Sequence, residues 1–376
     1  MKSNSRRGFL GRLGLAVSAA VVSPLEQAAQ GIRKTVQTMN PILEVKPMGF
    51  QWETLDPFLF CVHHEDDFPR GNDQMGPAAS LTGRSLGDDF IIKDGFRMYH
   101  GKQVPGFPGH PHRGFETITV VRKGLVDHAD SMGAAGRYGN GDVQWMTAGG
   151  GVQHSEMFPL LNKDKGNPLE LFQIWLNLPA KSKMVKPHFK MFWAEQIPQV
   201  EHTDAQGRKT RVEVIAGKLG KSKALQPPPD SWAADPLHEV AVWNILMDEQ
   251  ADFTLPAAGK EINRMLYFYE GEQLLIDGNP VSSYKSVRVL GSASLKLKAA
   301  KGKAQILVLQ GKPINEQVIQ YGPFVMNTKE EIKAAFDDYH RTGFGGWPWK
   351  KADQVHDRSL GRFAKHADGK QEKPGV

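Results

Sequence analysis

The sequence predicts an all-β protein made of two β-barrels of similar length, followed by one helix near the C-terminus. Of its 376 residues, 39 are glycine and 24 are proline, and so many turn-forming residues favour short strands over a helical bundle. Runs rich in β-branched and aromatic residues recur in two series, on either side of a polar, proline-containing stretch near residues 185–200. The two halves indicate a duplicated barrel, although the sequence shows no strong internal repeat.

The individual elements follow from local patterns. In the first half, strands are predicted at residues 117–121 and 171–176. In the second half, five more are predicted, at residues 211–216, 239–246, 265–269, 286–290 and 305–309. The helix is expected to begin after Thr328, which forms a capping box with Glu331. One apolar face follows, made of Ile332, Ala335, Phe336 and Tyr339. Beyond Gly343 we expect a loose tail.

Composition limits the classes of protein that fit. Hydrophobic residues make up 40% and charged residues 23%, as in ordinary folded proteins. The single cysteine, Cys61, excludes internal disulfides and cysteine-rich metal sites, and its apolar neighbours indicate a buried packing residue. The net charge is +6, and about half of it lies in residues 1–30. We therefore expect a weakly basic protein with no nucleic-acid partner.

Residues 1–29 have the form of a twin-arginine export signal. The pair Arg6 and Arg7 precedes an aromatic residue and a leucine, and a short apolar stretch rich in glycine and alanine follows. That stretch is too short to span a bilayer, so we expect no stable membrane insertion after the signal is removed. The alternative is a disordered basic tail. The signal would export the protein already folded, which predicts a periplasmic location.

Two short motifs carry the chemistry. His110 and His112 are two residues apart, as are His154 and Glu156, and in a strand such residues point to the same face. Two neighbouring strands could therefore bring three imidazoles and a carboxylate together, a set that suits one divalent first-row metal ion and leaves positions open for a substrate. The alternative is packed or exposed histidines with no common focus.

The surroundings of these motifs resemble the two cupin motifs and, more specifically, the pirin family. The resemblance is carried by Pro-Gly-His-Pro-His-Arg-Gly-Phe-Glu-Thr at 108–117, Gly-Asp-Val-Gln-Trp-Met-Thr-Ala-Gly at 141–149 and His-Ser-Glu-Met at 154–157. It continues in Leu-Phe-Gln-Ile-Trp-Leu-Asn-Leu-Pro at 171–179 and in the stretch 318–332. Together these motifs extend over most of residues 50–340.

The resemblance implies a bicupin, in which two jelly-roll barrels lie face to face and one metal ion is bound in the N-terminal barrel. We place that metal-binding domain at residues 40–187, the second cupin domain at 190–326, and the helix and tail at 327–376. The family's ligands fall on His110, His112, His154 and Glu156. Iron(II) is the expected metal, with manganese, nickel, copper and zinc as alternatives.

The resemblance also implies an activity. Some pirins resemble quercetin 2,3-dioxygenases, which predicts a dioxygenase that uses dioxygen on a small, flavonol-like aromatic substrate, with Glu156 as the catalytic base. The alternative is a non-catalytic, metal-dependent regulatory or protein-binding bicupin. The export signal argues against the nuclear role of some family members.

Several residues remain open to more than one interpretation. In ordinary cupins Glu116 would be a ligand, and it has the same strand parity as His110, but pirins take their carboxylate from the second motif. We therefore predict that Glu156 is the ligand and Glu116 a neighbour. The long insertion between Phe60 and Phe107 is expected to shape access to the metal. Its residues 63–67, two histidines and three acids, would form either a second metal cluster or a solvated acidic loop. His128 and Asp130 would lie either behind the ligands or at the rim of the site.

Overall fold

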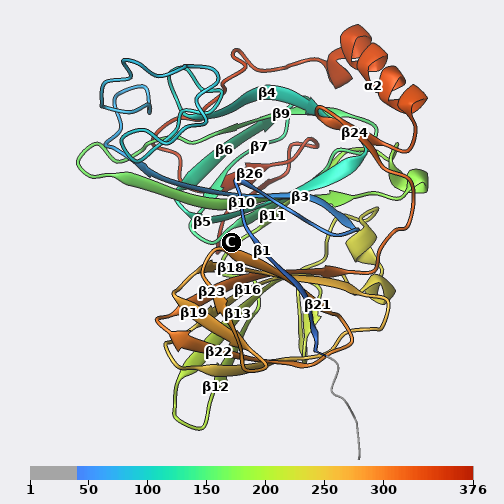
Figure 1. Ribbon diagram of the computed structural model, residues 1–376. Helices are drawn as coiled ribbons and strands as arrows, with labels where there is room; N and C mark the ends of the chain where they lie inside the picture. Colours follow the sequence, from blue (N-terminus) through green and yellow to red (C-terminus); the bar gives the residue numbers. More distant parts are fainter. Residues whose placement is uncertain (1–39, 376) are drawn as a thin grey trace, which may run out of the picture. The chain divides into compact units, whose positions relative to one another are not determined.

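The computed structural model describes residues 40–375, and strands dominate this part of the chain (Figure 1). The predicted export signal at residues 1–29 lies outside it and stays a prediction. Within residues 40–375, no helix is long and apolar enough to cross a membrane. The strands form two barrels, as predicted, and each barrel consists of two antiparallel sheets.

The first barrel contains two six-stranded sheets. Neighbouring strands of the first sheet are, in spatial order, β11 (His188–Phe192), β8 (Val143–Thr147), β5 (Phe115–Lys123), β10 (Asn167–Asn177), β3 (Phe58–Phe68) and β2 (Gln51–Trp52). Those of the second are β27 (Gln371–Glu372), β26 (Phe363–Lys365), β7 (Ala135–Gly139), β6 (Leu125–Asp130), β9 (Val152–Met157) and β4 (Gly106–His112). Apolar side chains of both sheets fill the space between them.

The second barrel contains a seven-stranded and a four-stranded sheet. The larger has the order β1 (Ile42–Pro47), β21 (Lys285–Leu290), β18 (Asn263–Glu270), β23 (Ala304–Gly311), β16 (Ala241–Met247), β13 (Lys209–Ala216) and β12 (Gln199–Thr203). The smaller has the order β17 (Asp252–Leu255), β22 (Leu295–Lys301), β19 (Gln273–Ile276) and β20 (Asn279–Ser282). All seven strands predicted from sequence are found in the two barrels.

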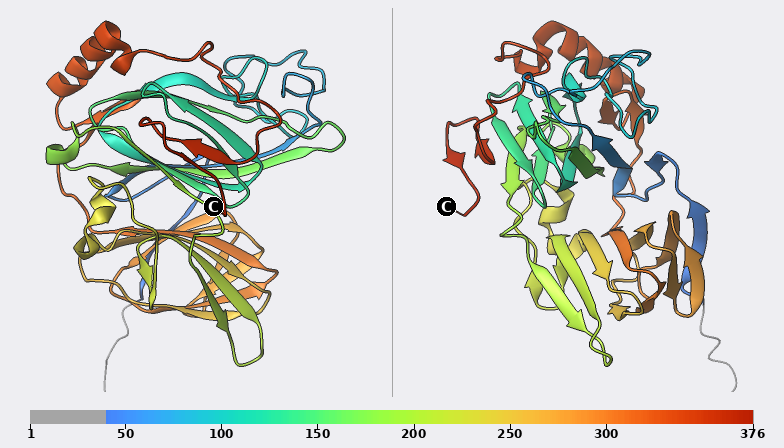
Figure 2. Two further views of the ribbon diagram at one scale, coloured as in Figure 1. Left: turned by 180° about the vertical axis from the view of Figure 1, so that it is seen from behind. Right: turned by 90° about the vertical axis from the view of Figure 1, so that its left-hand side faces the viewer.

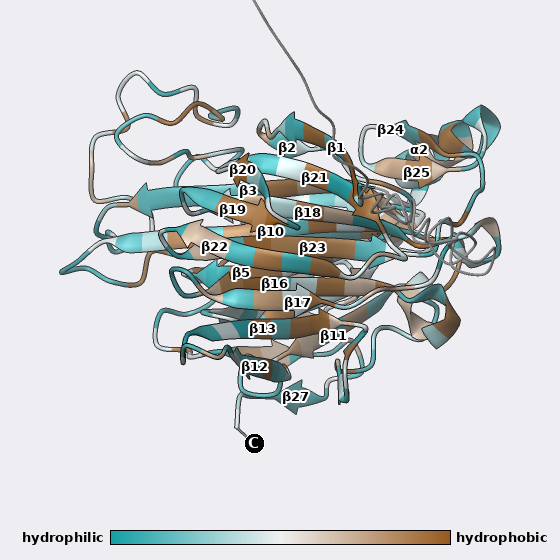
Figure 3. Cartoon of the chain, turned by 60° about the horizontal axis from the view of Figure 1, so that its bottom comes forward, coloured by the Kyte–Doolittle hydropathy of each residue, from teal (hydrophilic) through white to brown (hydrophobic). Residues whose placement is uncertain are grey.

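The barrels meet face to face, because the sheets between them are apolar on both sides. In β18, Leu266 and Phe268 belong to the core of the second barrel, whereas Met265, Tyr267 and Tyr269 belong to a cluster shared with the first barrel. Such two-sided burial requires continuous apolar runs rather than simple alternation. Brown, hydrophobic stretches along β23, β16 and β10 show this pattern (Figure 3). The predicted all-β bicupin fold is therefore confirmed.

An element near the start of the described chain lies against the second barrel, and an element near its end lies against the first. Strand β1 pairs with β21 of the second barrel, although residues 40–187 were assigned to the first. The hairpin of β24 (Ile319–Tyr321) and β25 (Phe324–Met326) contacts the first barrel, where Lys183 Nζ donates to the carbonyl oxygen of Val325. The predicted division at 187–190 did not anticipate these crossings.

The remaining short elements are β14 (Lys218–Leu219), β15 (Ser222–Lys223), η1 (Ala180–Ser182), η2 (Trp232–Ala234), η3 (Pro236–His238) and η4 (Gly343–Gly345).

Helix α2 (Lys329–Thr342) has the predicted start and the predicted apolar face. Thr328 Oγ1 accepts from the Glu331 backbone N–H, and the Glu331 carboxylate accepts from the Thr328 N–H, so the capping box is complete. The helix ends at Gly343, whose φ of 54° is left-handed. The apolar face packs with Phe324 and Met326 of the β24–β25 hairpin, beside which the helix lies in Figure 1.

The segment after Gly343 is not the loose tail that we predicted. Its strand β26 pairs with β7 and extends a sheet of the first barrel (Figure 2). Arg137 of β7 forms a fully buried ion pair with Asp127, and its Nε and Nη2 atoms each lie 2.7 Å from the carboxylate. The remaining guanidinium hydrogens are donated to the tail, to the carbonyl oxygens of His356, Asp357 and Leu360. The sequence prediction failed because this segment is ordered by contacts distant in sequence, not by local periodicity.

Candidate metal centre

Three histidines converge inside the first barrel. His110 and His112 lie on β4, and His154 lies on β9, directly opposite His110 in the antiparallel ladder. Their nearest ligand atoms all lie within 4.8 Å of one another. Of residues 40–375, these three form the only group of three or more potential ligands with such spacing. The sequence motifs therefore do have a common focus.

Hydrogen bonds orient two of these rings. His110 Nδ1 lies 3.0 Å from the carbonyl oxygen of Pro108, and His112 Nδ1 lies 3.4 Å from that of Pro323. A carbonyl oxygen can only accept, so both Nδ1 atoms carry the hydrogen and both Nε2 lone pairs are free. Hydrogen bonds of this kind orient metal-binding histidines in other proteins.

The three imidazoles are neutral at neutral pH. Burial lowers the pKa of His110 to about 4 and holds the pKa values of His112 and His154 well below the usual range; the neighbouring histidines add to this effect. His154 is fully buried, yet neither of its ring nitrogens has a hydrogen-bond partner among the described residues. An unpartnered buried nitrogen is costly, and a metal ion would satisfy it. The donor set therefore fits a first-row divalent metal.

Glu156 lies beside the triad on β9. Its Oε2 atom is 3.7 Å from His154 Nε2, and Gln173 Nε2 donates to the same oxygen at 3.3 Å. Thr119 Oγ1 lies 3.1 Å from the other oxygen, Oε1. Burial raises the pKa of this carboxyl to about 7. Glu156 is thus placed to serve as a fourth ligand or as a proton acceptor, although the assignment of ligands stays a prediction.

Glu116 points away from the triad, although its even spacing from His110 would place both side chains on the same face of one straight strand. Its oxygens accept hydrogen bonds from Thr147 Oγ1 at 2.6 Å and from Ser231 Oγ, a residue of the second half of the chain, at 2.5 Å. The alternation of faces does not continue from His110 to Glu116, because the chain turns between β4 and β5 at Gly114. Glycine is required at this turn, since φ is +85° and a Cβ atom would lie 1.9 Å from the Val325 carbonyl oxygen.

His128 and Asp130 lie against the triad and not at the rim. On β6, His128 is opposite Glu156 and Asp130 is opposite His154. The His128 ring is 5.5 Å from the His154 ring, and its Nε2 atom is 3.2 Å from the Asp130 carboxylate. Both side chains are fully buried. Of the two interpretations left open by the sequence, the structure favours the position behind the ligands.

A cavity of about 270 Å³ opens onto His110, His112 and Glu156. Its walls are mainly aromatic and aliphatic, which suits a small aromatic molecule. The other residues that line it are Phe50, Phe60, Val62, His64, Phe90, His100, Phe107, Thr119, Phe158, Leu171, Gln173 and Trp175. Phe90 and His100 come from the long insertion, which therefore does shape the cavity.

Both interpretations of residues 63–67 were wrong. These residues belong to β3, in which His63 and His64 are buried on opposite faces. His63 stacks on Phe172 between the barrels, with ring centroids 4.8 Å apart, whereas His64 lines the cavity. The pair is neither a metal cluster nor a solvated loop, because both faces of β3 are covered at His63 and His64; only Glu65 and Asp67 further along the strand are exposed. Cys61 of the same strand is buried and free, as predicted.

Fold and site together define a bicupin with a candidate metal centre in its first barrel. The pirin family model matches residues 72–176, and the model of the pirin C-terminal cupin domain matches residues 242–345. A "Pirin-like protein" of Caulobacter vibrioides is 36% identical over 258 residues, which cover 68% of this chain and 87% of that protein. The chain belongs to the pirin family, as the motifs predicted.

Two further relatives carry the name of an enzyme. A Pseudomonas aeruginosa protein named "Putative quercetin 2,3-dioxygenase" is 36% identical over 266 residues, covering 67% of this chain and 85% of that protein. The crystal structure of a quercetin 2,3-dioxygenase from Acinetobacter baumannii is 28% identical, with a TM-score of 0.62, and the match covers 81% of this chain and 98% of that one.

Proposed function

We propose that this protein is a metal-dependent dioxygenase of the quercetin 2,3-dioxygenase type, acting on a flavonol-like aromatic substrate. One observation carries the proposal: two residues of the histidine triad, His110 and His112, line an aromatic cavity of about 270 Å³ together with Glu156. A purely structural metal site would be closed, whereas this one faces a space that a small molecule can enter. The relatives named as quercetin dioxygenases support the choice of substrate class.

The chain's own residues have three tasks in this proposal. His110, His112 and His154, with Glu156, would hold the metal, for which we propose iron(II). A metal held there would supply Lewis acidity, which would lower the pKa of a substrate hydroxyl group. Glu156 lines the cavity beside His110 and His112, so its carboxylate is placed to accept the hydroxyl proton.

The remaining residues prepare the carboxylate and exclude water. Thr119 Oγ1 and Gln173 Nε2 lie within 3.3 Å of the Glu156 oxygens and fix their orientation. Aromatic side chains, among them Phe107 and Trp175, form the walls around the substrate. Removing water strengthens each charge interaction at the site.

Oxygen uptake tests the proposal. Protein loaded without air with iron(II), manganese, nickel, copper or zinc should consume dioxygen when quercetin is added, with at least one of these metals. His154→Ala should abolish uptake, and His202→Ala, a histidine on the exposed strand β12, should not. No quercetin-dependent uptake with any bound metal would overturn the enzymatic proposal in favour of a metal-dependent regulatory or protein-binding role.

We also propose that the protein is exported to the periplasm through its twin-arginine motif, and that this route decides which metal is bound. Imidazole and carboxylate ligands bind copper and zinc more tightly than iron or manganese. Folding before export would let the weaker metal enter first. Exchange of Arg6 and Arg7 for lysine should retain the protein in the cytoplasm. Rerouting the unfolded chain through the general secretion pathway should replace iron or manganese with copper or zinc; identical metal content by both routes would refute this role of the signal.

A further inference from the structure

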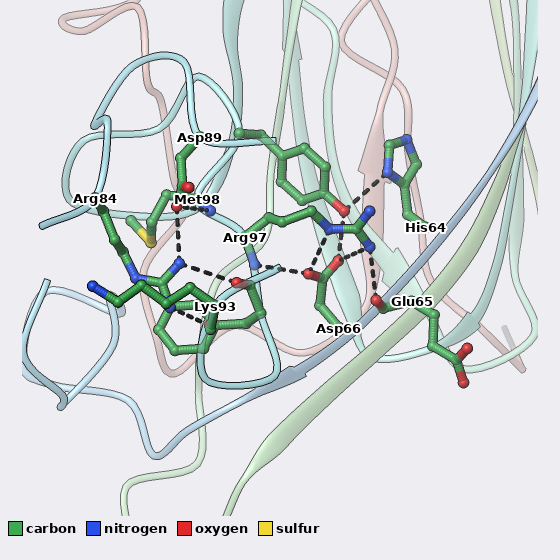
Figure 4. A network of polar contacts seen from close by, with 10 residues as sticks. His64, Glu65, Asp66, Arg84, Asp89, Lys93, Arg97 and Met98 are labelled. Atoms are coloured by element: carbon green, nitrogen blue, oxygen red, sulfur yellow. Dashed lines mark hydrogen bonds and ion pairs between the residues drawn. The ribbon is translucent and has the colours of Figure 1, made fainter. Parts of the chain in front are cut away.

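A chain of hydrogen bonds leads from the insertion to the cavity wall. Strand β3, at the start of the insertion, carries His64 and Asp66 on one face, and a later part of the insertion contributes Arg97 and Tyr99. The Arg97 guanidinium binds both oxygens of Asp66, at 3.0 Å through Nε and 3.1 Å through Nη2 (Figure 4). The Tyr99 hydroxyl lies 2.5 Å from Asp66 Oδ2, and His64 Nδ1 lies 2.9 Å from the same hydroxyl.

The positions of the hydrogens in this chain follow from the donors available. Burial raises the pKa of Asp66, but two guanidinium hydrogen bonds and the Arg97 backbone N–H, at 2.8 Å, oppose this effect and favour an ionised Asp66 that can only accept. Tyr99 therefore donates its single hydroxyl hydrogen to Asp66. The Tyr99 oxygen is then an acceptor for His64, so His64 carries its hydrogen on Nδ1.

This tautomer leaves His64 Nε2 with a free lone pair. Burial, assisted by Arg97 and His63, lowers the pKa of His64 to about 3, so the ring is neutral at physiological pH. Within residues 40–375, no hydrogen bond engages Nε2. The residue is only 5% exposed, and it lines the cavity. This acceptor is therefore available to a hydrogen-bond donor on a molecule in the cavity.

The ring is also fixed in place by its neighbours. Phe50, Tyr99 and Phe107 contact it edge to face, with centroid distances of 5.7, 4.9 and 5.8 Å. The Phe107 ring is also 6.3 Å from the His110 ring, so it contacts both His64 and a residue of the triad. His64 thus presents an acceptor at a point in the cavity separate from the candidate metal ligands.

We propose that His64 Nε2 recognises substrate by accepting a hydrogen bond from a second hydroxyl group, remote from the one held at the triad. The substrate class is therefore a polyhydroxylated aromatic molecule, and Arg97, Asp66 and Tyr99 are positioning residues that hold His64 in the accepting tautomer. This inference rests on the proposed use of the cavity for an aromatic substrate, but it does not require that the substrate react.

Binding of quercetin without oxygen tests the inference. Quercetin and a series of flavonols that each lack one hydroxyl group are titrated into metal-loaded protein by calorimetry. Wild-type protein should bind one analogue about 10-fold more weakly than quercetin, the scale of one hydrogen bond. His64→Leu should bind quercetin about 10-fold more weakly than wild type and should no longer distinguish that analogue.

Tyr99→Phe provides a second variant that keeps the ring and removes the hydroxyl that fixes the tautomer. It should lose part of the same discrimination, whereas His202→Ala should retain all of it. Melting curves and metal content identify any variant that fails to fold. Equal affinities of wild type and His64→Leu for quercetin and every analogue would overturn the inference.

Failure of this inference is distinguishable from failure of the proposed function. Discriminating binding without oxygen uptake would refute the dioxygenase and support the role of His64. Quercetin-dependent uptake with a His64→Leu variant that binds all flavonols as wild type does would refute only the role of His64. No binding of any flavonol to the metal-loaded wild type would overturn both.

Discussion

The ionisation of Glu116 should make the wild-type protein less stable as the pH rises, and replacing Glu116 with glutamine should abolish this effect. The carboxyl group is fully buried where the two halves of the chain meet, with Thr147 and Ser231 as its hydrogen-bond partners. Burial raises the pKa of Glu116 from an ordinary value of 4.5 to about 7, and the two hydroxyl groups only partly oppose this effect.

The sign and size of the effect follow from the two pKa values. Between pH 4.5 and about 7 the folded protein binds a proton at Glu116 that the unfolded chain has released. The stabilising contribution is therefore complete below pH 4.5 and is lost as the pH rises through 7. The gap between 4.5 and about 7 corresponds to about 3 kcal/mol of unfolding free energy.

Urea denaturation of metal-free protein at pH 5 and pH 8 measures this difference. The stability of Glu116→Gln relative to wild type should increase by about 2 to 3 kcal/mol between the two pH values, because glutamine cannot ionise and the wild type has already lost part of the full effect at pH 5. Other titrating groups, including Glu156, are common to both proteins and cancel. Glu330→Gln, on the exposed face of α2, should follow the wild type. Parallel pH profiles for Glu116→Gln and wild type would refute the reasoning.

Three further changes test other parts of the structure. Glu156→Ala should weaken metal binding by about 10-fold or more in competition with a chelator, whereas Glu116→Ala should not; the reverse would reassign the carboxylate ligand. Phe90→Ala should alter flavonol affinity while metal content stays unchanged, and unaltered affinities across several flavonols would remove the insertion from the cavity's function. Removal of residues 347–376 should lower stability in urea by roughly 3 kcal/mol, because Arg137 loses its buried carbonyl partners; an unchanged unfolding midpoint would contradict this.

Much of the fold could be predicted because the relevant signals are local. The strands are β-rich runs bounded by turns, and α2 is set by the Thr328–Glu331 capping box and one apolar face. The pairing of β1 with β21 and of β26 with β7 was not predictable in this way. Each joins segments more than 200 residues apart, and short exposed strands carry little pattern of their own.

The residues of the site were likewise predictable only where the signal is local. The spacing of His110, His112 and His154 predicted their convergence, since residues two apart share a face of a strand. The spacing alone could not exclude Glu116 as a ligand, because the turn at Gly114 interrupts the alternation of strand faces between His110 and Glu116. Nor could it place His64, because alternation along β3 does not tell which face is directed to the cavity and which to the second barrel.

Metal binding by purified, metal-free protein tests the central claim most directly. Titration with iron(II) in the absence of oxygen should give about one ion bound per chain. His154→Ala, checked for folding by its melting curve, should lose that binding, and His202→Ala should retain it. Wild-type protein that binds no iron(II) or other first-row divalent ion at this stoichiometry, or a His154→Ala variant that binds it as tightly as wild type, would contradict the account.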